Sequence, residues 1–190
     1  MPSYSLTGIM ETACGIRLND DNTFDFFYSY GAADRNGYGT WEAQGDDIVL
    51  HTGYADKTGF TIESEKKYPG SGVVVKVENF DRMFYDNTRM FVVNGTESEE
   101  QGADREGFFR FTAKTAEKLL VSCVFFPDNM ATIIPKDVQD NNYILKVNHD
   151  LLLVHFNEVH LRKTETGLEG SFPLLNMTYG TRTFTFREDI

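Results

Sequence analysis

Short segments in which apolar and polar residues alternate are the feature that most constrains how this chain can fold. In the segment TFDFFYSY, residues 23–30, four aromatic side chains fall on one face of an extended strand and a mostly polar set falls on the other. The aromatic face consists of Phe24, Phe26, Tyr28 and Tyr30, and the other face consists of Thr23, Asp25, Phe27 and Ser29. This division is typical of an antiparallel sheet that packs on one side only.

Comparable segments recur along the whole chain, separated by turn residues such as those of NDDN, residues 19–22. Only AKTAEK, residues 113–118, has the character of a helix, and strands do not alternate with helices, which excludes a doubly wound fold. The expected fold class is all-β. The expected strands lie within 4–12, 15–19, 23–30, 37–44, 48–53, 60–67, 72–77, 89–97, 107–113, 118–126, 131–136, 143–147, 158–172 and 180–188.

The segment YPGSG, residues 68–72, interrupts this pattern with proline and glycine and predicts a boundary between two domains. An antiparallel barrel needs about eight strands to close around its own side chains or a small ligand, and residues 1–68 supply about five or six. We therefore predict that residues 157–190 return to complete a barrel begun by residues 1–68. Residues 70–156 are expected to form a small β-sandwich, and the acidic segment 97–106 within it a solvated loop.

The composition is that of a folded but acidic protein. Apolar residues make up 41% of the chain, and 18 basic against 29 acidic residues give a net charge of -11. Such a chain repels phosphate backbones, so nucleic acid is not an expected partner. No stretch approaches transmembrane length and the first residues lack a signal-peptide pattern, so a cytoplasmic location is expected, or the envelope if the natural chain begins further upstream.

The first quarter of the chain contains the ordered pattern G-x-x-E, C-x-I-x-L-x-x-D-x-T-F and G-T-W-x-x-x-G-D-x-I-x-L. Over residues 4–52 this pattern resembles the N-terminal, lipocalin-like (calycin-type) barrel of bacterial copper-homeostasis lipoproteins. The matching residues are Cys14, Ile16, Leu18, Asp21, Thr23, Phe24, Gly39, Thr40, Trp41, Gly45, Asp46, Ile48 and Leu50. The resemblance implies a barrel fold more than an activity, since most of these residues are turn or barrel-facing types.

The chain departs from that family where the family's function lies. The family carries a C-x-x-C pair before the first turn, whereas here Glu11 stands at the first position and Cys14 is alone. One thiol cannot form a redox couple or supply two thiolates to a soft metal. We therefore expect neither copper binding nor any other metal or cofactor.

A second pattern lies in ADREGFFRF, residues 103–111, where Asp104, Gly107, Phe109 and Phe111 match a turn-and-strand signature. Around residues 72–126 the chain resembles a prealbumin-like sandwich of the carboxypeptidase regulatory type, similar in layout to an immunoglobulin-like domain. The resemblance implies a supporting or interaction role.

Reactive groups are sparse in this sequence. Cys14 lies near Glu11, Asp20 and Asp21, whose charges raise the pKa of a thiol, and Cys123 lies in an apolar run typical of a buried strand. No nucleophile has a base at a recognisable spacing, so no catalytic residue is predicted.

His155 and His160 present two alternatives. If Asn157 and Glu158 form a tight turn, the two imidazoles face each other across a hairpin and begin a metal site. Otherwise residues 150–156 are the crossing between domains and the histidines are structural, which is the favoured interpretation.

Together these patterns predict a non-catalytic binding protein with a small apolar or amphipathic ligand inside the barrel. The predicted lining residues are Met10, Phe24, Phe26, Tyr28, Tyr30 and Trp41. For these aromatic residues themselves, a densely packed interior without a cavity is the favoured interpretation, because protein interiors usually pack densely. A protein-interaction or structural module is the second hypothesis for the function, and an acid–base hydrolase is the third. The sequence makes no prediction of ligand identity or oligomeric state.

Overall fold

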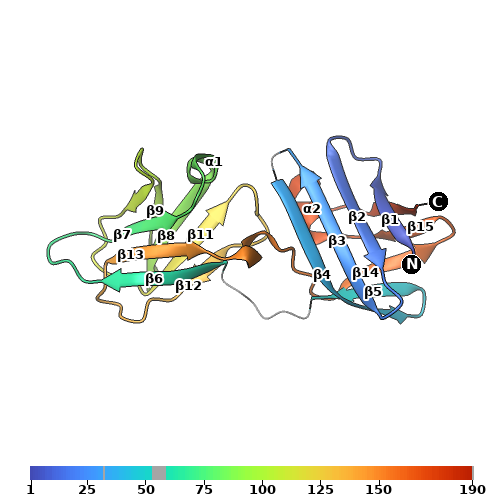
Figure 1. Ribbon diagram of the computed structural model, residues 1–190, viewed down its shortest axis with the longest axis horizontal. Helices are drawn as coiled ribbons and strands as arrows, with labels where there is room; N and C mark the ends of the chain where they lie inside the picture. Colours follow the sequence, from blue (N-terminus) through green and yellow to red (C-terminus); the bar gives the residue numbers. More distant parts are fainter. Residues whose placement is uncertain (32, 53–58, 190) are drawn as a thin grey trace. The chain divides into compact units, whose positions relative to one another are not determined.

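The computed structural model describes residues 1–31, 33–52 and 59–189 (Figure 1). The chain divides into two compact units, Met1–Asp56 with Leu152–Ile190 and Lys57–Leu151. Strands dominate both units, which confirms the expected all-β fold class.

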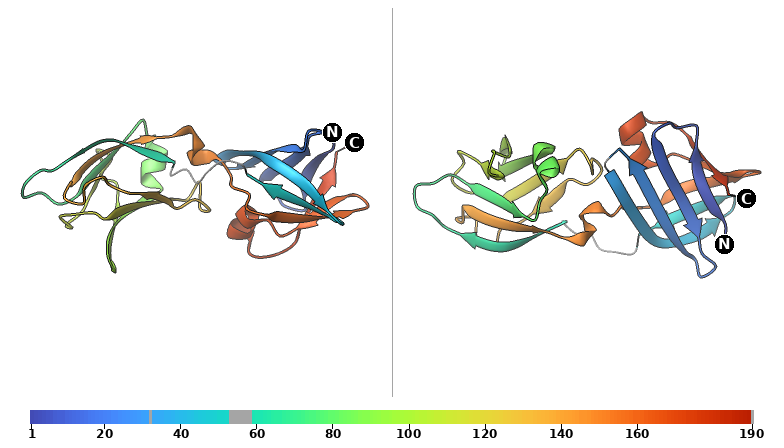
Figure 2. Two further views of the ribbon diagram at one scale, coloured as in Figure 1. Left: turned by 90° about the horizontal axis from the view of Figure 1, so that it is seen from below. Right: turned by 45° about the horizontal axis from the view of Figure 1, so that its top comes forward.

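The first unit is a closed antiparallel barrel with the strand order β1-β16-β15-β14-β5-β4-β3-β2 (Figures 1 and 2). Its strands are β1 (Ser3–Thr7), β2 (Thr12–Leu18), β3 (Thr23–Tyr30), β4 (Ala33–Gln44), β5 (Asp47–His51), β14 (Val159–Thr164), β15 (Gly167–Gly170) and β16 (Phe184–Glu188). The last three strands fall within the segment 157–190 that the sequence analysis assigned to the barrel. They close it because β14 pairs with β5 and β16 pairs with β1.

Apolar side chains from all eight strands fill the inside of this barrel. Their burial follows the alternation of each strand, as in β3, where every second residue from Phe24 to Tyr28 is buried. Helix α2 (Pro173–Tyr179) adds Leu174 and Leu175 to the same core. A proline stands in its first turn, where the missing N–H breaks no helical hydrogen bond.

Arg35 on β4 is an unexpected member of the barrel interior, with only 1% of its surface exposed. A buried guanidinium needs hydrogen-bond acceptors. Its Nε and Nη2 donate to the carbonyl oxygens of Leu152 (3.3 Å) and Leu153 (3.1 Å). The N–H of Val154 also donates to the carbonyl of Asn36 (2.7 Å), so the segment after the 3₁₀ helix η1 (His149–Leu152) is fixed along β4.

The second unit is a small sandwich of two four-stranded sheets. One sheet has the order β10-β7-β13-β6 and the other β12-β11-β8-β9, and side chains from both sheets form one core. Every pair of neighbours is antiparallel except β7 and β13. The strands are β6 (Phe60–Lys66), β7 (Val74–Glu78), β8 (Thr88–Asn94), β9 (Glu97–Gly102), β10 (Phe108–Arg110), β11 (Lys118–Cys123), β12 (Ala131–Ile133) and β13 (Asn142–Val147).

The domain boundary differs from the one predicted at residues 68–72. Strand β6 pairs with β13 and belongs to the sandwich, although the sequence analysis placed it in the barrel. The segment 68–72 is a turn inside the sandwich, fixed by the side chain of Asn141. Its Nδ2 donates to the carbonyls of Tyr68 and Ser71, and its Oδ1 accepts from the N–H of Tyr68.

Two further expectations for this unit were wrong. Residues 113–118 contain no helix, and the short helix of the unit is α1 (Arg82–Asp86), whose first turn is capped by the carboxylate of Asp81. The acidic segment expected as a loop begins with strand β9, which pairs with β8. Charged residues on such an edge strand help to keep other chains from pairing there.

The residues behind the sandwich resemblance have structural roles. The carboxylate of Asp104 accepts hydrogen bonds from the N–H groups of Glu106 and Phe108, and Gly107 has a φ of 79°, a value that favours glycine. Phe109 and Phe111 are buried in the sandwich core.

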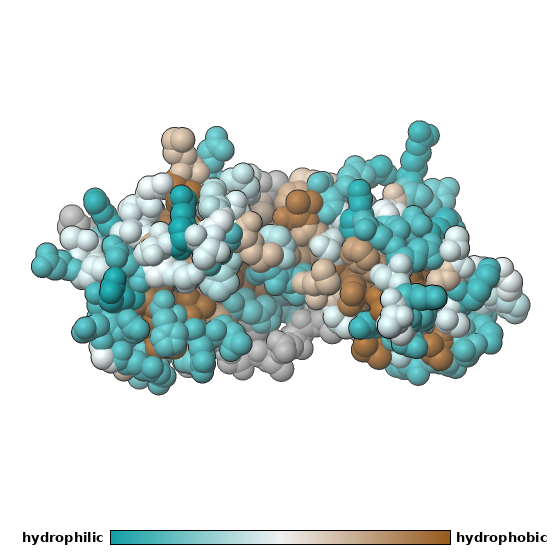
Figure 3. All heavy atoms as spheres, turned by 180° about the vertical axis from the view of Figure 1, so that it is seen from behind, coloured by the Kyte–Doolittle hydropathy of each residue, from teal (hydrophilic) through white to brown (hydrophobic). Residues whose placement is uncertain are grey.

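The face of the molecule drawn in Figure 3 is mostly hydrophilic, with separate apolar areas on each unit. Among the residues that the structure describes, no helix has the length and apolar character needed to cross a membrane.

Candidate functional site

Three of the six residues predicted to line a ligand cavity lie together inside the barrel. Phe24, Phe26 and Tyr28 are buried on the inner face of β3. The ring of Phe156 meets those of Phe24 and Phe26 edge-on, with centroids 4.9 and 5.0 Å apart, and Phe172 stacks on Phe26 at 5.2 Å. These separations are typical of aromatic rings in contact, so the rings fill the space between the strands.

The other three predicted residues lie elsewhere. Met10 is 87% exposed and points away from the interior. Tyr30 is 40% exposed at the end of β3, where its ring meets Tyr179 of α2 edge-on. Trp41 packs against the edge of the core and its Nε1 donates to the carbonyl of Asn19 (3.1 Å). The structure therefore does not bring the six residues into one site.

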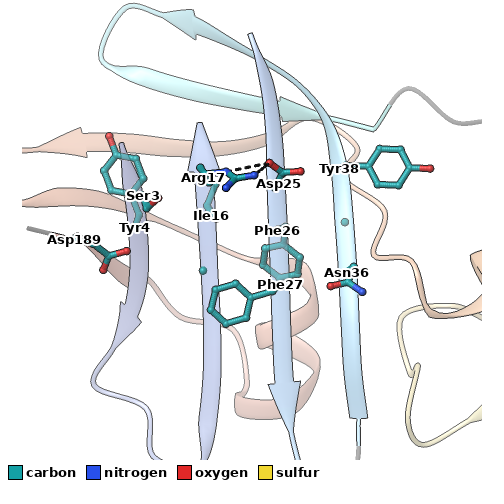
Figure 4. Close-up of a pocket in the computed structure, with 12 residues that line it drawn as sticks. Ser3, Tyr4, Ile16, Arg17, Asp25, Phe26, Phe27, Asn36, Tyr38 and Asp189 are labelled. Atoms are coloured by element: carbon teal, nitrogen blue, oxygen red, sulfur yellow. Dashed lines mark hydrogen bonds and ion pairs between the residues drawn. The ribbon is translucent and has the colours of Figure 1, made fainter. Parts of the chain in front are cut away.

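A groove of about 550 Å³ lies on the outer face of the barrel instead, across β1, β2, β3 and β4 (Figure 4). Its exposed side chains come from alternate positions of three neighbouring strands, those that point away from the core. They are Arg17 on β2, Asp25 and Phe27 on β3, and Asn36 and Tyr38 on β4. Ser3 and Asp189 lie at its β1 side, where the N–H of Asp189 donates to the carbonyl of Ser3 (2.8 Å).

Phe27 lies over β2 because its cross-strand partner is Gly15. A Cβ atom at Gly15 would lie 2.4 Å from Cε1 of Phe27, so only glycine leaves room for the ring to rest on the strand (Figure 4). The ring covers the backbone of Gly15, which is buried, while 48% of the Phe27 surface remains open to solvent. The groove thus contains an aromatic ring held in place by the sheet.

Arg17 and Asp25 form an ion pair beside this ring (Figure 4). Arg17 donates to Oδ2 of Asp25 from Nη2 at 2.6 Å and from Nε at 3.2 Å, and Asn19 donates to the same oxygen at 3.2 Å. These hydrogen bonds, that of Arg17 above all, hold the pKa of Asp25 below its usual value. Within the described residues, Oδ1 of Asp25 and Nη1 of Arg17 have no hydrogen-bond partner.

Two residues of β4 complete the groove. Asn36 stands opposite Phe27 in the β3–β4 register, and Tyr38, which is 51% exposed, stands opposite Asp25. The side-chain amide of Asn36 makes no hydrogen bond within the part of the chain that the structure describes. It offers both a donor and an acceptor to solvent.

This site was not predicted from the sequence, because the second face of residues 23–30 is mostly polar. Phe27 is the only large apolar residue on that face, and its position opposite a glycine was the available signal. The two residues pair in the register that sets Leu18 opposite Phe24.

Neither thiol is poised for chemistry. Cys14 and Cys123 are buried free cysteines, and burial raises the pKa of both thiols. The sequence analysis expected a raised pKa at Cys14 from neighbouring carboxylates, whereas desolvation inside the barrel is the cause. A thiol without accessible thiolate is a poor nucleophile and a poor metal ligand.

The histidine hairpin is absent. Residues 150–156 form no strand with β14, which pairs with β5 and β15, so His155 and His160 do not face each other as strand partners. Exposed His160 instead lies 3.7 Å from Asp47, measured from Nδ1 to Oδ2. No group of three or more metal-ligating side chains occurs among the described residues.

Comparisons with known proteins found no matching family model, no matching curated protein and no matching solved structure. The closed eight-stranded barrel is compatible with a lipocalin-like barrel, but nothing in the comparisons supports the likeness to copper-homeostasis lipoproteins.

Proposed function

We propose that this is a non-catalytic binding protein whose ligand site is the groove on the outer face of β1–β4. The expected ligand is a small amphipathic molecule, with one apolar face and several polar groups at its edge.

The exposed ring of Phe27 beside the Arg17–Asp25 pair is the observation that carries this proposal. Binding sites for small molecules combine apolar and aromatic contact surface with a few polar groups in fixed positions. Here the sheet fixes both parts, because neighbouring strands hold every one of these side chains at a defined spacing.

The barrel interior is the less favoured location for a ligand. A molecule there would have to displace the rings of Phe156 and Phe172 from their contacts with Phe26. The packing of a buried phenylalanine is worth on the order of 3–5 kcal/mol, as its truncation to alanine shows, and displacing the rings would lose part of it. The outer groove requires no such rearrangement.

A protein-interaction module is the second candidate. Tyr, Phe and Arg are enriched in protein interfaces, and the groove exposes one of each. A partner protein would, however, have to cover a wider surface than the groove, since stable interfaces bury about 800 Å² on each side.

A two-dimensional NMR titration of the whole chain with a library of neutral, fragment-sized amphipathic molecules tests the proposal. We expect hits to move the side-chain amide signal of Asn36 and the backbone amides of Arg17 and Phe27. Shifts confined to interior methyl groups would contradict it, as would a library without hits at millimolar concentration.

Matched variants locate the binding. Phe27→Leu keeps an apolar cover on Gly15 but removes the ring, so it should weaken binding about tenfold or more. Tyr30→Leu removes an exposed ring from the same strand outside the groove and should leave affinity unchanged. Equal loss in both variants would place the ligand elsewhere.

A further inference from the structure

The ligand class can be narrowed from the geometry and charge of the groove, and this step rests on the proposed function. The ring of Phe27 is seen face-on over the strands in Figure 4, so it lies along the sheet beside Gly15 of β2, and 48% of the residue is exposed. The open face of a single aromatic ring suits a ligand that is itself a ring and presents aliphatic C–H groups on one side. Aliphatic C–H groups pack favourably on an aromatic face, whose π electrons are weakly negative.

The polar atoms around Phe27 differ in kind and are near neighbours on the sheet. Oδ1 of Asp25 is an acceptor, Nη1 of Arg17 is a donor, and the amide of Asn36 supplies one of each. A hydroxyl group both donates and accepts, so a ring that carries several hydroxyls at its edge can satisfy all three side chains. Hydrogen bonds to the charged pair are the stronger ones.

The charge of the groove argues against anionic ligands. Arg17 and Asp25 neutralise each other at 2.6 Å, and Asp189 adds a carboxylate at the β1 side. The chain as a whole carries a net charge of -11, which opposes phosphate and other anionic groups. A neutral ligand avoids this repulsion.

The topology argues against an extended peptide. A peptide that binds a sheet through its backbone needs an unpaired strand edge. The groove lies on the face of a closed barrel in which β1, β2, β3 and β4 are each paired on both sides. A peptide could therefore make only side-chain contacts there and would gain no backbone pairing. A ligand without a peptide backbone loses nothing by this.

We propose that the outer groove binds a neutral saccharide, with a pyranose ring stacked on Phe27 and its hydroxyls hydrogen-bonded to Arg17, Asp25 and Asn36. Tyr38, opposite Asp25 in the register, provides a second aromatic surface on β4 for a neighbouring sugar ring. The volume of about 550 Å³ accommodates a short oligosaccharide.

The test uses the whole chain and four neutral disaccharides, namely cellobiose, maltose, lactose and N,N′-diacetylchitobiose. Affinity is measured by NMR titration of the Asn36 side-chain amide and by calorimetry. At least one disaccharide should bind with a dissociation constant of about 1 mM or lower. Asn36→Ala and Phe27→Leu should each weaken that binding about tenfold or more, and Met10→Ala, an exposed site outside the groove, should not.

The outcomes separate this inference from the proposed function. If no disaccharide binds while other neutral fragments move the Asn36 signal, the saccharide assignment is overturned and the groove remains a binding site. If neither class of probe moves that signal, both proposals fail. Disaccharide binding that survives Phe27→Leu and Asn36→Ala overturns the placement of the sugar.

Discussion

The two faces of strand β3 carry the same residue type in opposite roles. Phe26 points inward, where Phe156 and Phe172 surround it, and Phe27 points outward, where it rests on Gly15 and remains half exposed. The inner ring stabilises the barrel through packing, whereas the outer ring covers one glycine and leaves a face free. Adjacent aromatic residues can therefore divide folding and binding between them, because a strand sends successive side chains to opposite sides.

Cysteine labelling should show the largest difference between the faces. With Cys123→Ala as background, Cys14 points inward and should react with iodoacetamide on the order of 1,000-fold more slowly than the unfolded chain, because labelling requires the barrel to open. A thiol placed next to it by Ala13→Cys, at an exposed position, should react at nearly the unfolded rate when Cys14 is replaced by alanine. Mass spectrometry of timed samples measures both rates, and fast labelling at Cys14 would contradict a filled interior.

The two phenylalanines should differ by several kcal/mol in stability. Phe26→Ala should lower the free energy of unfolding of the barrel by about 3–5 kcal/mol, since it leaves a cavity. Phe27→Ala should lower it by about 1 kcal/mol or less, because the removed ring is half exposed. Trp41 is the single tryptophan and lies in the barrel, so its fluorescence during urea unfolding reports on this unit alone. An equal loss of unfolding free energy in Phe26→Ala and Phe27→Ala would contradict the division into a packed inner face and an open outer face.

Adding a methyl group at a glycine should also have different effects inside and outside the barrel. A Cβ at Gly37 would lie 2.6 Å from Cε2 of Phe156 inside the packed core, so Gly37→Ala should cost about 1–3 kcal/mol. A Cβ at Gly15 would lie 2.4 Å from Phe27, an exposed ring that can turn aside, so Gly15→Ala should cost less than Gly37→Ala. Gly15→Ala should instead displace the ring of Phe27 and so weaken ligand binding in the groove. Urea unfolding measures the loss of stability in each variant, and a ligand titration measures the loss of affinity.

The smallest expected effect concerns the pH dependence of the outer face. The pKa of Asp25 is depressed by hydrogen bonds from Arg17 and Asn19, so its contribution to stability is present above the unfolded pKa of about 3.9 and is lost as pH falls through the lower folded value. Because the pair is exposed, Asp25→Asn should cost less than about 1 kcal/mol at pH 6, and the cost should shrink toward pH 2. Thermal unfolding across this pH range tests the sign, and a cost that grows in acid would contradict it.

Local pattern predicted much of the fold, because strand periodicity is a property of neighbouring residues. The alternation in 23–30 identified β3 and its buried face, and the count of strands led to the expectation that the tail returns to the barrel. Pairing partners are not local. The pattern of residues 60–67 fits either unit, and only its pairing with β13 assigns β6 to the sandwich. Likewise, Pro69 and Gly70 predict a turn, but not whether that turn separates domains.

The candidate site was harder to predict for a related reason. The sequence alone does not tell a buried apolar residue from an exposed one, and the predicted set mixed buried Phe26 with exposed Met10. The groove depends on the alignment of β2, β3 and β4, which brings Arg17, Asp25 and Asn36 together from separate segments. That alignment follows from cross-strand register rather than from any motif.

The most direct test of the central claim is to offer one sample two ligands, sodium decanoate for the interior and cellobiose for the groove, and to record side-chain NMR spectra. We expect cellobiose to move the Asn36 amide and the Phe27 ring signals, while neither ligand moves the methyl signals of Leu50 and Leu161 in the core. Decanoate that shifts those interior methyls, with an unchanged Asn36 signal in cellobiose, would show that the barrel binds its ligand inside.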